Sequence, residues 1–217
     1  HQAEDFIGSH DEKKLSPINS KVAGNEAMML SLIGPCLRGL FAEETSQNWI
    51  VHYRKDPSAS TFASSLECAS WSQIGTATPD HVIRTKQKPL LLNLKHWSDS
   101  EKLREEVSSA LKEYKNNYHK YFKTNAQSKG ADKKELDPLP RIILVAGLGL
   151  VTIGKSFRET EIAADIYQHT IDIIKKSFNI GQFAPLKDND LFDMEYWSLE
   201  QAKLGKKKPA VAQGKII

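Results

Sequence analysis

The chain has 217 residues, 40% of them hydrophobic, so it is long enough to bury a sizeable core. Its 30 basic and 27 acidic side chains leave a formal charge of +3, which is too balanced to favour a nucleic acid or a membrane surface as a partner. With two cysteines, no apolar leader and no apolar run near the roughly 20 residues of a membrane helix, composition favours the reducing cytoplasm.

The first 41 residues predict a helix end, a linker and a second helix. Residues 1–7 resemble the end of a helix, and residues 8–21 have the polar composition of a linker. Apolar residues then recur at helical spacing over residues 22–41, where Gly34 and Pro35 predict a break or a kink. We therefore expect the compact part of the chain to begin near residue 22.

Two strands and two further helices are expected between residues 48 and 122. Residues 48–54 (NWIVHYR) have the β-branched and aromatic content of a strand, and Asp56 with Pro57 predicts a turn and a helix that continues to residue 66. Residues 89–94 predict a strand whose proline occupies the first position. Ser98 is expected to cap a long amphipathic helix that ends near residue 122.

The middle of the chain predicts a loop followed by a strand, a turn, a strand and a helix. Residues 123–140 are polar and rich in lysine, so we expect an exposed, mobile loop. RIILVA (141–146) and LVTI (150–153) predict two strands, joined by a tight turn in which Gly147 and Gly149 supply positive φ angles. Ser156 is expected to cap a helix over residues 157–178.

The periodic pattern weakens beyond residue 181. The aromatic residues Phe192, Tyr196 and Trp197 predict a segment docked on the core. The basic run at 206–208 is typical of a solvated linker. The last four residues, GKII, are expected to open a strand of a further domain.

The sequence GLVTIGKS, residues 149–156, matches the phosphate-binding P-loop pattern and makes Lys155 a candidate ligand of a nucleotide. Residues 150–153, however, prefer an extended strand, whose N–H groups would bond to neighbouring strands instead of a phosphate. The spacing of Gly147, Gly149 and Gly154 also departs from the dinucleotide fingerprint, because the third glycine comes two positions late. Binding of a nucleotide by a P-loop-like site is therefore kept only as the lowest-ranked hypothesis for the function.

A second group of candidate residues lies within nine positions of the chain. A phosphate or carboxylate could be held by the cations of Arg84 and Lys86, and His81 could act as a base or a ligand. The full candidate set for ligand binding is Thr78, Asp80, His81, Arg84, Lys86 and Lys155. In the plainer alternative, Asp80 caps a short helix and the cations are surface charges.

Metal and nucleophile motifs are missing from the sequence. No two of the seven histidines stand at the one- or three-residue gaps that metal sites usually show. The nucleophile elbow G-x-S-x-G is also absent. We therefore expect no metal and no cofactor bound to this chain, and the residues alone identify no catalytic group.

Three segments carry a resemblance to a known family: GTATPDHVIRTK (75–86), PRIILVAGLGLVTIGKS (140–156) and DLFDMEYWSLEQAKLG (190–205). Together they resemble the region between the two catalytic modules of bifunctional proteins that join a class II, rhamnulose-1-phosphate-type aldolase to a short-chain dehydrogenase. The resemblance implies a parent enzyme of bacterial sugar metabolism, with a divalent metal in its aldolase half and NAD in its dehydrogenase half. The parent would cleave a ketose 1-phosphate and oxidise the resulting aldehyde.

The same resemblance bears on Leu148. In register with the class II aldolase pattern, Leu148 stands where a zinc-binding histidine would be, and a leucine cannot ligate zinc. The resemblance therefore implies a degenerate aldolase-like domain that keeps the fold and lacks the metal.

These observations predict an α/β protein with three α/β/α layers and a mixed or mainly antiparallel sheet flanked by helices. Residues 1–21 would be a preceding aldolase helix and a linker, residues 22–186 the degenerate domain, and residues 187–217 a docked tail, a linker and a first dehydrogenase strand. The expected function is connection or positioning of the flanking aldolase and dehydrogenase domains, with homo-oligomers possible. The alternative is a sugar-phosphate-binding domain that uses the 78–86 residues.

Overall fold

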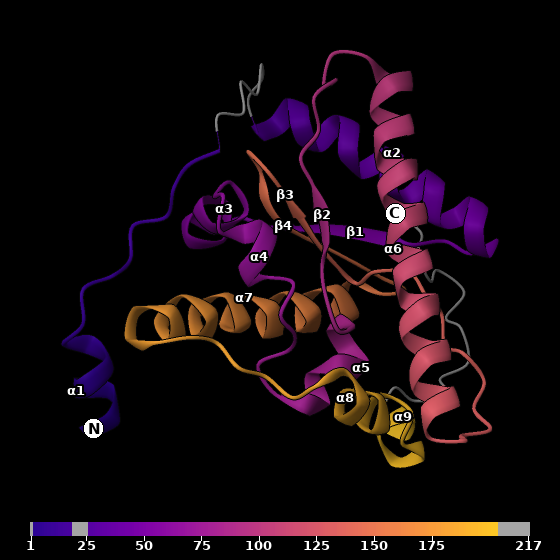
Figure 1. Ribbon diagram of the computed structural model, residues 1–217. Helices are drawn as coiled ribbons and strands as arrows, with labels where there is room; N and C mark the ends of the chain where they lie inside the picture. The colour runs from indigo at the N-terminus through magenta and orange to yellow at the C-terminus, as the bar shows by residue number, and fades with distance from the viewer. Residues whose placement is uncertain (1, 19–25, 204–217) are drawn as a thin grey trace.

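A four-stranded mixed sheet lies at the centre of the molecule, for which the computed structural model describes residues 2–18 and 26–203 (Figure 1). The strand order is β1-β4-β3-β2. Strand β4 (Gly149–Gly154) pairs antiparallel with both β1 (Ile50–Arg54) and β3 (Ile142–Val145), while β2 (Leu90–Leu92) runs parallel to β3. The predicted mixed sheet is thus confirmed.

Helices cover both faces of this sheet and complete three layers. One face packs against α2 (Glu26–Thr45) and α6 (Ser100–Ser128), and the other packs against α3 (Pro57–Ala63) and α7 (Phe157–Ile180). Alternate residues of β3 and β4 divide between the two cores. Ile143, Val145, Val151 and Ile153 belong to the first core, and Ile142, Leu144 and Leu150 to the second. The period of two thus places an apolar side chain on either face, as in a strand covered on both sides.

The β3–β4 hairpin turns as its glycines predict. Gly147 has a φ angle of 83° and Gly149 one of 123°, both in the region that side-chain-bearing residues avoid. Gly149 also lies against α3, because a Cβ atom built on it would come 3.1 Å from Ser60 Cα. Glycine is therefore required there by backbone conformation and by close approach.

The long helix α6 differs from the prediction at both ends. Its cap is Asp99, which accepts a hydrogen bond from the Lys102 N–H, and not Ser98. It continues to Ser128, so the first part of the predicted loop 123–140 is helical. The buried stripe of the helix extends through Tyr121 to Asn125, whose amide donates to the Tyr121 carbonyl at 2.8 Å. Packing therefore overrides the polar composition of this stretch.

Pro35 does not interrupt α2, which runs through the expected break without a gap. The predicted start of this helix at residue 22 lies outside the described residues. The buried face of the helix continues on both sides of the proline, with Met29 and Ile33 before it and Leu37 and Phe41 after it. Burial along that face stabilises the helix against the loss of one backbone hydrogen bond.

The other elements of the described residues are short. They are α1 (Gln2–Gly8), α4 (Cys68–Trp71), the 3₁₀ helix η1 (Pro79–His81), α5 (Val82–Thr85), α8 (Asp188–Glu195) and α9 (Ser198–Lys203). Helix α3 ends at Ala63 and so stops short of the predicted residue 66. The Ile18 N–H donates to the Ser64 carbonyl and the Leu66 N–H donates to the Ser16 carbonyl, so residues 16–18 of the predicted linker lie against the 64–66 segment.

Of the three aromatic residues from which a docked tail was predicted, Phe192 and Tyr196 are buried and Trp197 is 47% exposed. Phe192 on α8 is 1% exposed and packs in a cluster with Tyr121 and Tyr196. The lysine run at 206–208 and the GKII segment lie outside the described residues. Within residues 2–18 and 26–203, no helix combines the length and apolarity needed to cross a membrane.

The turn glycine gives a first prediction. Gly149→Ala should lower the free energy of unfolding by about 1–3 kcal/mol, because the new Cβ meets the α3 backbone at a positive φ. Gly34→Ala is the matched control, since nothing lies within 4 Å of the position that its Cβ would take, and it should change stability by less than about 1 kcal/mol. Urea unfolding followed by circular dichroism measures both. Equal effects of the two substitutions would contradict the assigned turn.

Cys68 gives a second prediction, on pH. Burial raises the pKa of its thiol from 9.0 to about 11. Between these two pKa values the folded chain keeps a thiol proton that the unfolded chain loses. The contribution of the protonated thiol to the free energy of unfolding is therefore complete below pH 9 and is lost as the pH rises through 11. Between about pH 8.5 and 11 the wild type should lose on the order of 2 kcal/mol more stability than Cys68→Ala does. Parallel urea titrations of both chains would show the difference, and identical slopes would refute it.

Candidate functional site

The 78–86 segment forms two tight turns of helix, η1 and α5, which both contact α8. The Thr78 hydroxyl donates to Asp80 Oδ1 at 2.7 Å, and this bond lowers the pKa of the carboxyl group. Asp80 therefore stays ionised beside Thr78, and it does not cap the helix with its side chain. The two residues form one local pair at the surface.

His81 is half-buried in the same segment. Its Nδ1 atom is buried and has no hydrogen-bond partner among the described residues. Burial lowers the pKa of the imidazole, the nearby Asp80 carboxylate opposes that shift, and His169 reinforces it. The ring is thus held neutral at physiological pH, with one nitrogen unused.

The two cations of the segment do not converge on a common point. The Arg84 guanidinium donates to the carbonyl oxygen of Lys203 at 3.2 Å, at the end of α9. Lys86 has a φ angle of 63° and turns into the interior, where its side chain is 8% exposed. The predicted joint grip of Arg84 and Lys86 on one anion is therefore absent from the arrangement observed.

Lys86 instead belongs to a buried polar network that joins α5, α6 and α8. Its ammonium donates to Glu195 Oε1 at 3.2 Å and to the Tyr118 hydroxyl at 3.1 Å. Tyr118 in turn donates to Glu195 Oε1 at 2.8 Å and lies 2.9 Å from the Tyr196 hydroxyl. The Leu136 N–H donates to Tyr196, so the network also holds the loop after α6.

Burial governs the protonation of this network. Burial lowers the pKa of Lys86, and the Glu195 carboxylate opposes that shift. Burial also raises the pKa of Tyr118, and the nearby Glu195 carboxylate adds to that rise. Burial raises the pKa of Tyr196 to about 12. The tyrosines therefore remain neutral donors around one buried ion pair. Such an arrangement can hold helices together, and no local pattern in the sequence marks Glu195 or Tyr118 as a partner of Lys86.

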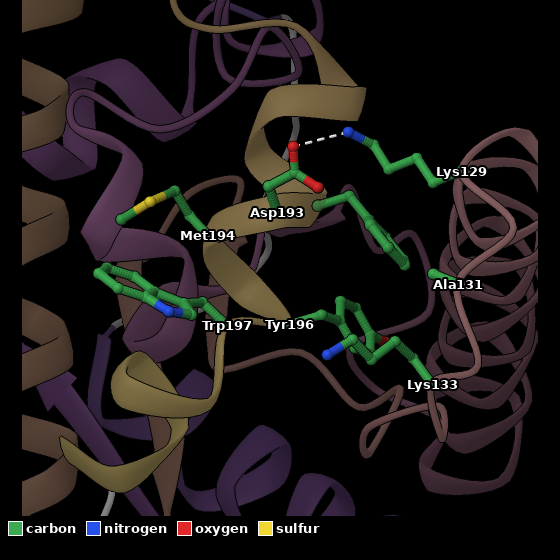
Figure 2. Close-up of a pocket in the computed structure, with 8 residues that line it drawn as sticks. Lys129, Ala131, Lys133, Asp193, Met194, Tyr196 and Trp197 are labelled. Atoms are coloured by element: carbon green, nitrogen blue, oxygen red, sulfur yellow. Dashed lines mark hydrogen bonds and ion pairs between the residues drawn. The ribbon is translucent and has the colours of Figure 1, made fainter.

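The surface beside this network is a shallow pocket of about 470 Å³ between α8 and the residues that follow α6. Figure 2 shows Lys129 reaching Asp193, an ion pair of 2.6 Å, and places Met194 and Trp197 on the side of α8 away from Tyr196. Trp197 is 47% exposed. The pocket is thus rimmed by a solvated ion pair and contains no cluster of reactive groups among its lining residues.

Lys155 lies away from the 78–86 segment. The Lys155 ammonium lies 5.6 Å from the centre of the Trp49 ring, and the Lys155 backbone N–H donates to Glu159 Oε2 at 2.8 Å. The expected strand over residues 150–153 is confirmed, because these residues pair with β1 on one side and β3 on the other. The N–H groups that a P-loop would turn toward phosphate are therefore committed to the sheet.

Leu148 lies in the hairpin turn and is 2% exposed, within the core shared by α2 and α6. Its carbonyl oxygen accepts a bond from the Tyr53 hydroxyl at 3.3 Å. Across residues 2–18 and 26–203, no three His, Cys, Asp or Glu side chains come close enough to hold a metal ion. An aliphatic side chain in an apolar core does not fit a zinc site.

Comparisons with known proteins agree with this fold. A family model described as "Aldolase class II, second domain" matches residues 29–204. The chain is 32% identical over 180 residues to the "Uncharacterized oxidoreductase YuxG" of Bacillus subtilis (strain 168), an alignment that covers 81% of this chain and 25% of that protein. The chain thus spans about a quarter of the length of this curated relative. No solved structure matches.

The buried ion pair gives a third prediction. Glu195→Leu should lower the free energy of unfolding by about 3–5 kcal/mol, because it leaves the Lys86 ammonium buried without its counter-charge. Lys86→Met combined with Glu195→Leu should recover part of that loss, since neither charge remains. Asp193→Asn, which breaks the solvated pair with Lys129, is the control and should cost less than about 1 kcal/mol.

A double-mutant cycle measures this coupling. It compares urea unfolding of the wild type, Glu195→Leu, Lys86→Met and the double variant. A double variant no more stable than Glu195→Leu, or a cost at Asp193 as large as that at Glu195, would contradict the assigned role of the buried pair.

Proposed function

The chain belongs to the family described as aldolase class II, second domain, and on that premise we propose that it connects and positions the parts of a larger enzyme without catalysing a reaction itself. Two kinds of residue support this proposal. The side chains that the sequence marks for chemistry bond mainly within the domain, and the position expected to hold a metal ligand carries an apolar side chain.

Leu148 is the observation that carries the proposal. It occupies the position that the class II aldolase resemblance gives to a metal-binding histidine, and it is 2% exposed in the hydrophobic core. Replacing an imidazole by an isobutyl group removes the lone pair that a metal needs and adds apolar area to the core. The domain gains packing at the place where a catalytic relative would hold its ion.

The larger enzyme would be a bifunctional aldolase and short-chain dehydrogenase. The match covers only 25% of a relative that is named an oxidoreductase, which leaves room in that protein for further domains. In such a parent, a metal-dependent aldolase half would release dihydroxyacetone phosphate and an aldehyde from a ketose 1-phosphate, and an NAD-dependent half would oxidise the aldehyde. Residues 1–21 and 187–217 would lead to these flanking domains, and the parent could form homo-oligomers.

A second candidate function is sugar-phosphate binding at the 78–86 segment. It is favoured by one observation, the buried Nδ1 of His81 that lacks a partner in the described structure. A bound hydroxyl or phosphate oxygen would complete the hydrogen bonding of the ring. Arg84 would have to exchange its bond with the Lys203 carbonyl for one with the phosphate.

Enzyme assays separate these proposals. The 217-residue chain, supplied with zinc and L-rhamnulose 1-phosphate, should release no dihydroxyacetone phosphate above the rate without protein, measured by coupled NADH oxidation. Elemental analysis of the purified chain should find far less than one zinc per chain. Turnover, or stoichiometric zinc, would refute the positioning role.

Calorimetry tests the second candidate. Dihydroxyacetone phosphate should give the same titration with wild type, His81→Ala and Arg84→Ala if the segment has only a structural role. A binding signal lost in both variants would establish sugar-phosphate binding there and replace the positioning role as the main function.

A further inference from the structure

Strand β1 lies at one edge of the sheet and has an open outer side. Within residues 2–18 and 26–203 it pairs with β4 alone. Helices α2 and α7 contact β1, and in Figure 1 they lie above and below it. Helices that cover the faces of a strand leave its outer backbone groups open to another strand. None of the candidate site residues lies on this edge.

The pairing of β4 decides which backbone groups of β1 face outward. The Ile153 N–H donates to the Arg141 carbonyl at 3.0 Å, so the odd-numbered residues of β4 bond to β3. The even-numbered residues of β4 then bond to β1, where they lie opposite even-numbered residues. The N–H and C=O groups of Val51 and Tyr53 therefore point away from β4, and no other described residue bonds to them.

The features that usually protect an edge strand are missing from β1. Its five residues contain no proline and pair with β4 in continuous register, so no bulge turns the edge away. Arg54 bonds to Asp165 at 2.6 Å and lies 3.7 Å from Glu161, and the neighbouring Lys55 pairs with Glu26 at 3.2 Å. The cations that would repel a second strand thus have counter-charges within the chain.

Two side chains beside the edge would gain from a further surface. Phe157, at the start of α7, is 55% exposed, and the centre of its ring lies 5.1 Å from that of His52. The buried Nδ1 atom of His52 has no hydrogen-bond partner among the described residues. Burial lowers the pKa of the imidazole and Glu161 opposes that shift, so the ring is neutral at pH 7. An aromatic ring and a neutral imidazole therefore flank the open backbone groups.

The edge is complementary to a second copy of itself. In antiparallel pairing about a two-fold axis at His52, all five residues of β1 overlap with those of the copy. Val51 then faces Tyr53 of the copy in a pair that exchanges both backbone hydrogen bonds, and β-branched and aromatic side chains are favourable partners there. Arg54 faces Ile50 of the copy, and the two neutral His52 rings face each other. No like charges meet along the strands.

We propose that the chain forms a two-fold symmetric dimer in which β1 pairs antiparallel with β1 of a second copy, joining two four-stranded sheets into one. A single strand pair buries less than the roughly 1,600 Å² of an ordinary stable interface, so the dimer should be of about micromolar affinity. It goes beyond the positioning role and needs no flanking domain. Its failure would leave the assays for aldol cleavage and zinc unaffected.

Sedimentation equilibrium of the 217-residue chain tests the proposal. The dimer fraction should rise between about 1 and 100 μM. Val51→Pro removes an outward N–H, which an edge strand tolerates, and should raise the dimer Kd at least about tenfold. Val51→Thr keeps both the N–H and the β-branched shape, so it is the matched control and should stay within about threefold of wild type. Circular dichroism checks that both variants are folded.

A wild type that stays monomeric at about 100 μM would overturn the proposal and leave the edge to a different chain. An unchanged Kd in Val51→Pro would place the contact on another surface, and so would an equal loss in Val51→Thr.

Cross-linking tests the register without relying on the proline variant. Opposite residues of a non-hydrogen-bonded antiparallel pair have Cα atoms about 4.5 Å apart, so His52→Cys should form a disulfide with its copy under mild oxidation. Ile50→Cys is the control, because its copy would lie about 13 Å away along the strand, beyond the reach of a disulfide. The wild type reports any reaction of Cys36 and Cys68. Equal cross-linking of the two variants, or none in His52→Cys, would contradict this pairing.

Discussion

The structure depends on burial of the β3–β4 hairpin on both of its faces. Every residue of the two strands is buried, and their side chains alternate between the core under α2 and α6 and the core under α3 and α7. Both faces of such strands must be covered, because an uncovered face would expose a row of aliphatic side chains to water. The two helical layers follow from this constraint, and so does the tight glycine turn that lets α3 approach.

The same constraint decides what the hairpin can do chemically. A strand in the middle of a sheet uses its N–H and C=O groups in two ladders, so residues 150–153 have none left for a phosphate. A turn that packs into a core favours an apolar residue, which Leu148 supplies. A sequence match to the P-loop pattern therefore indicates a phosphate site only when the residues between its glycines can form a loop.

Sequence reasoning found the elements whose pattern is repeated and local. The strands at 142–145 and 149–154, the glycine turn and the cap of α7 by Ser156 all follow from periodicity and from single-residue preferences. It missed the extension of α6 to Ser128, because the cluster that buries this part of the helix includes Phe192 and Tyr196, more than 60 residues later in the chain. Helix α2 likewise passes Pro35 because tertiary packing offsets a local penalty.

The site was harder to predict than the fold, for a related reason. Arg84 and Lys86 are two residues apart, yet one reaches the end of α9 and the other a carboxylate on α8. Lys86 has a positive φ angle and turns inward, and no residue beside it in the sequence predicts that backbone angle. Without Glu195, Lys86 would have no counter-charge in a site whose burial already lowers the pKa of its ammonium, so the buried position of Lys86 depends on the carboxylate that α8 supplies. The ion pair thus selects the one position of the tail in which both charges meet, and that position also builds the aromatic cluster between α6 and α8.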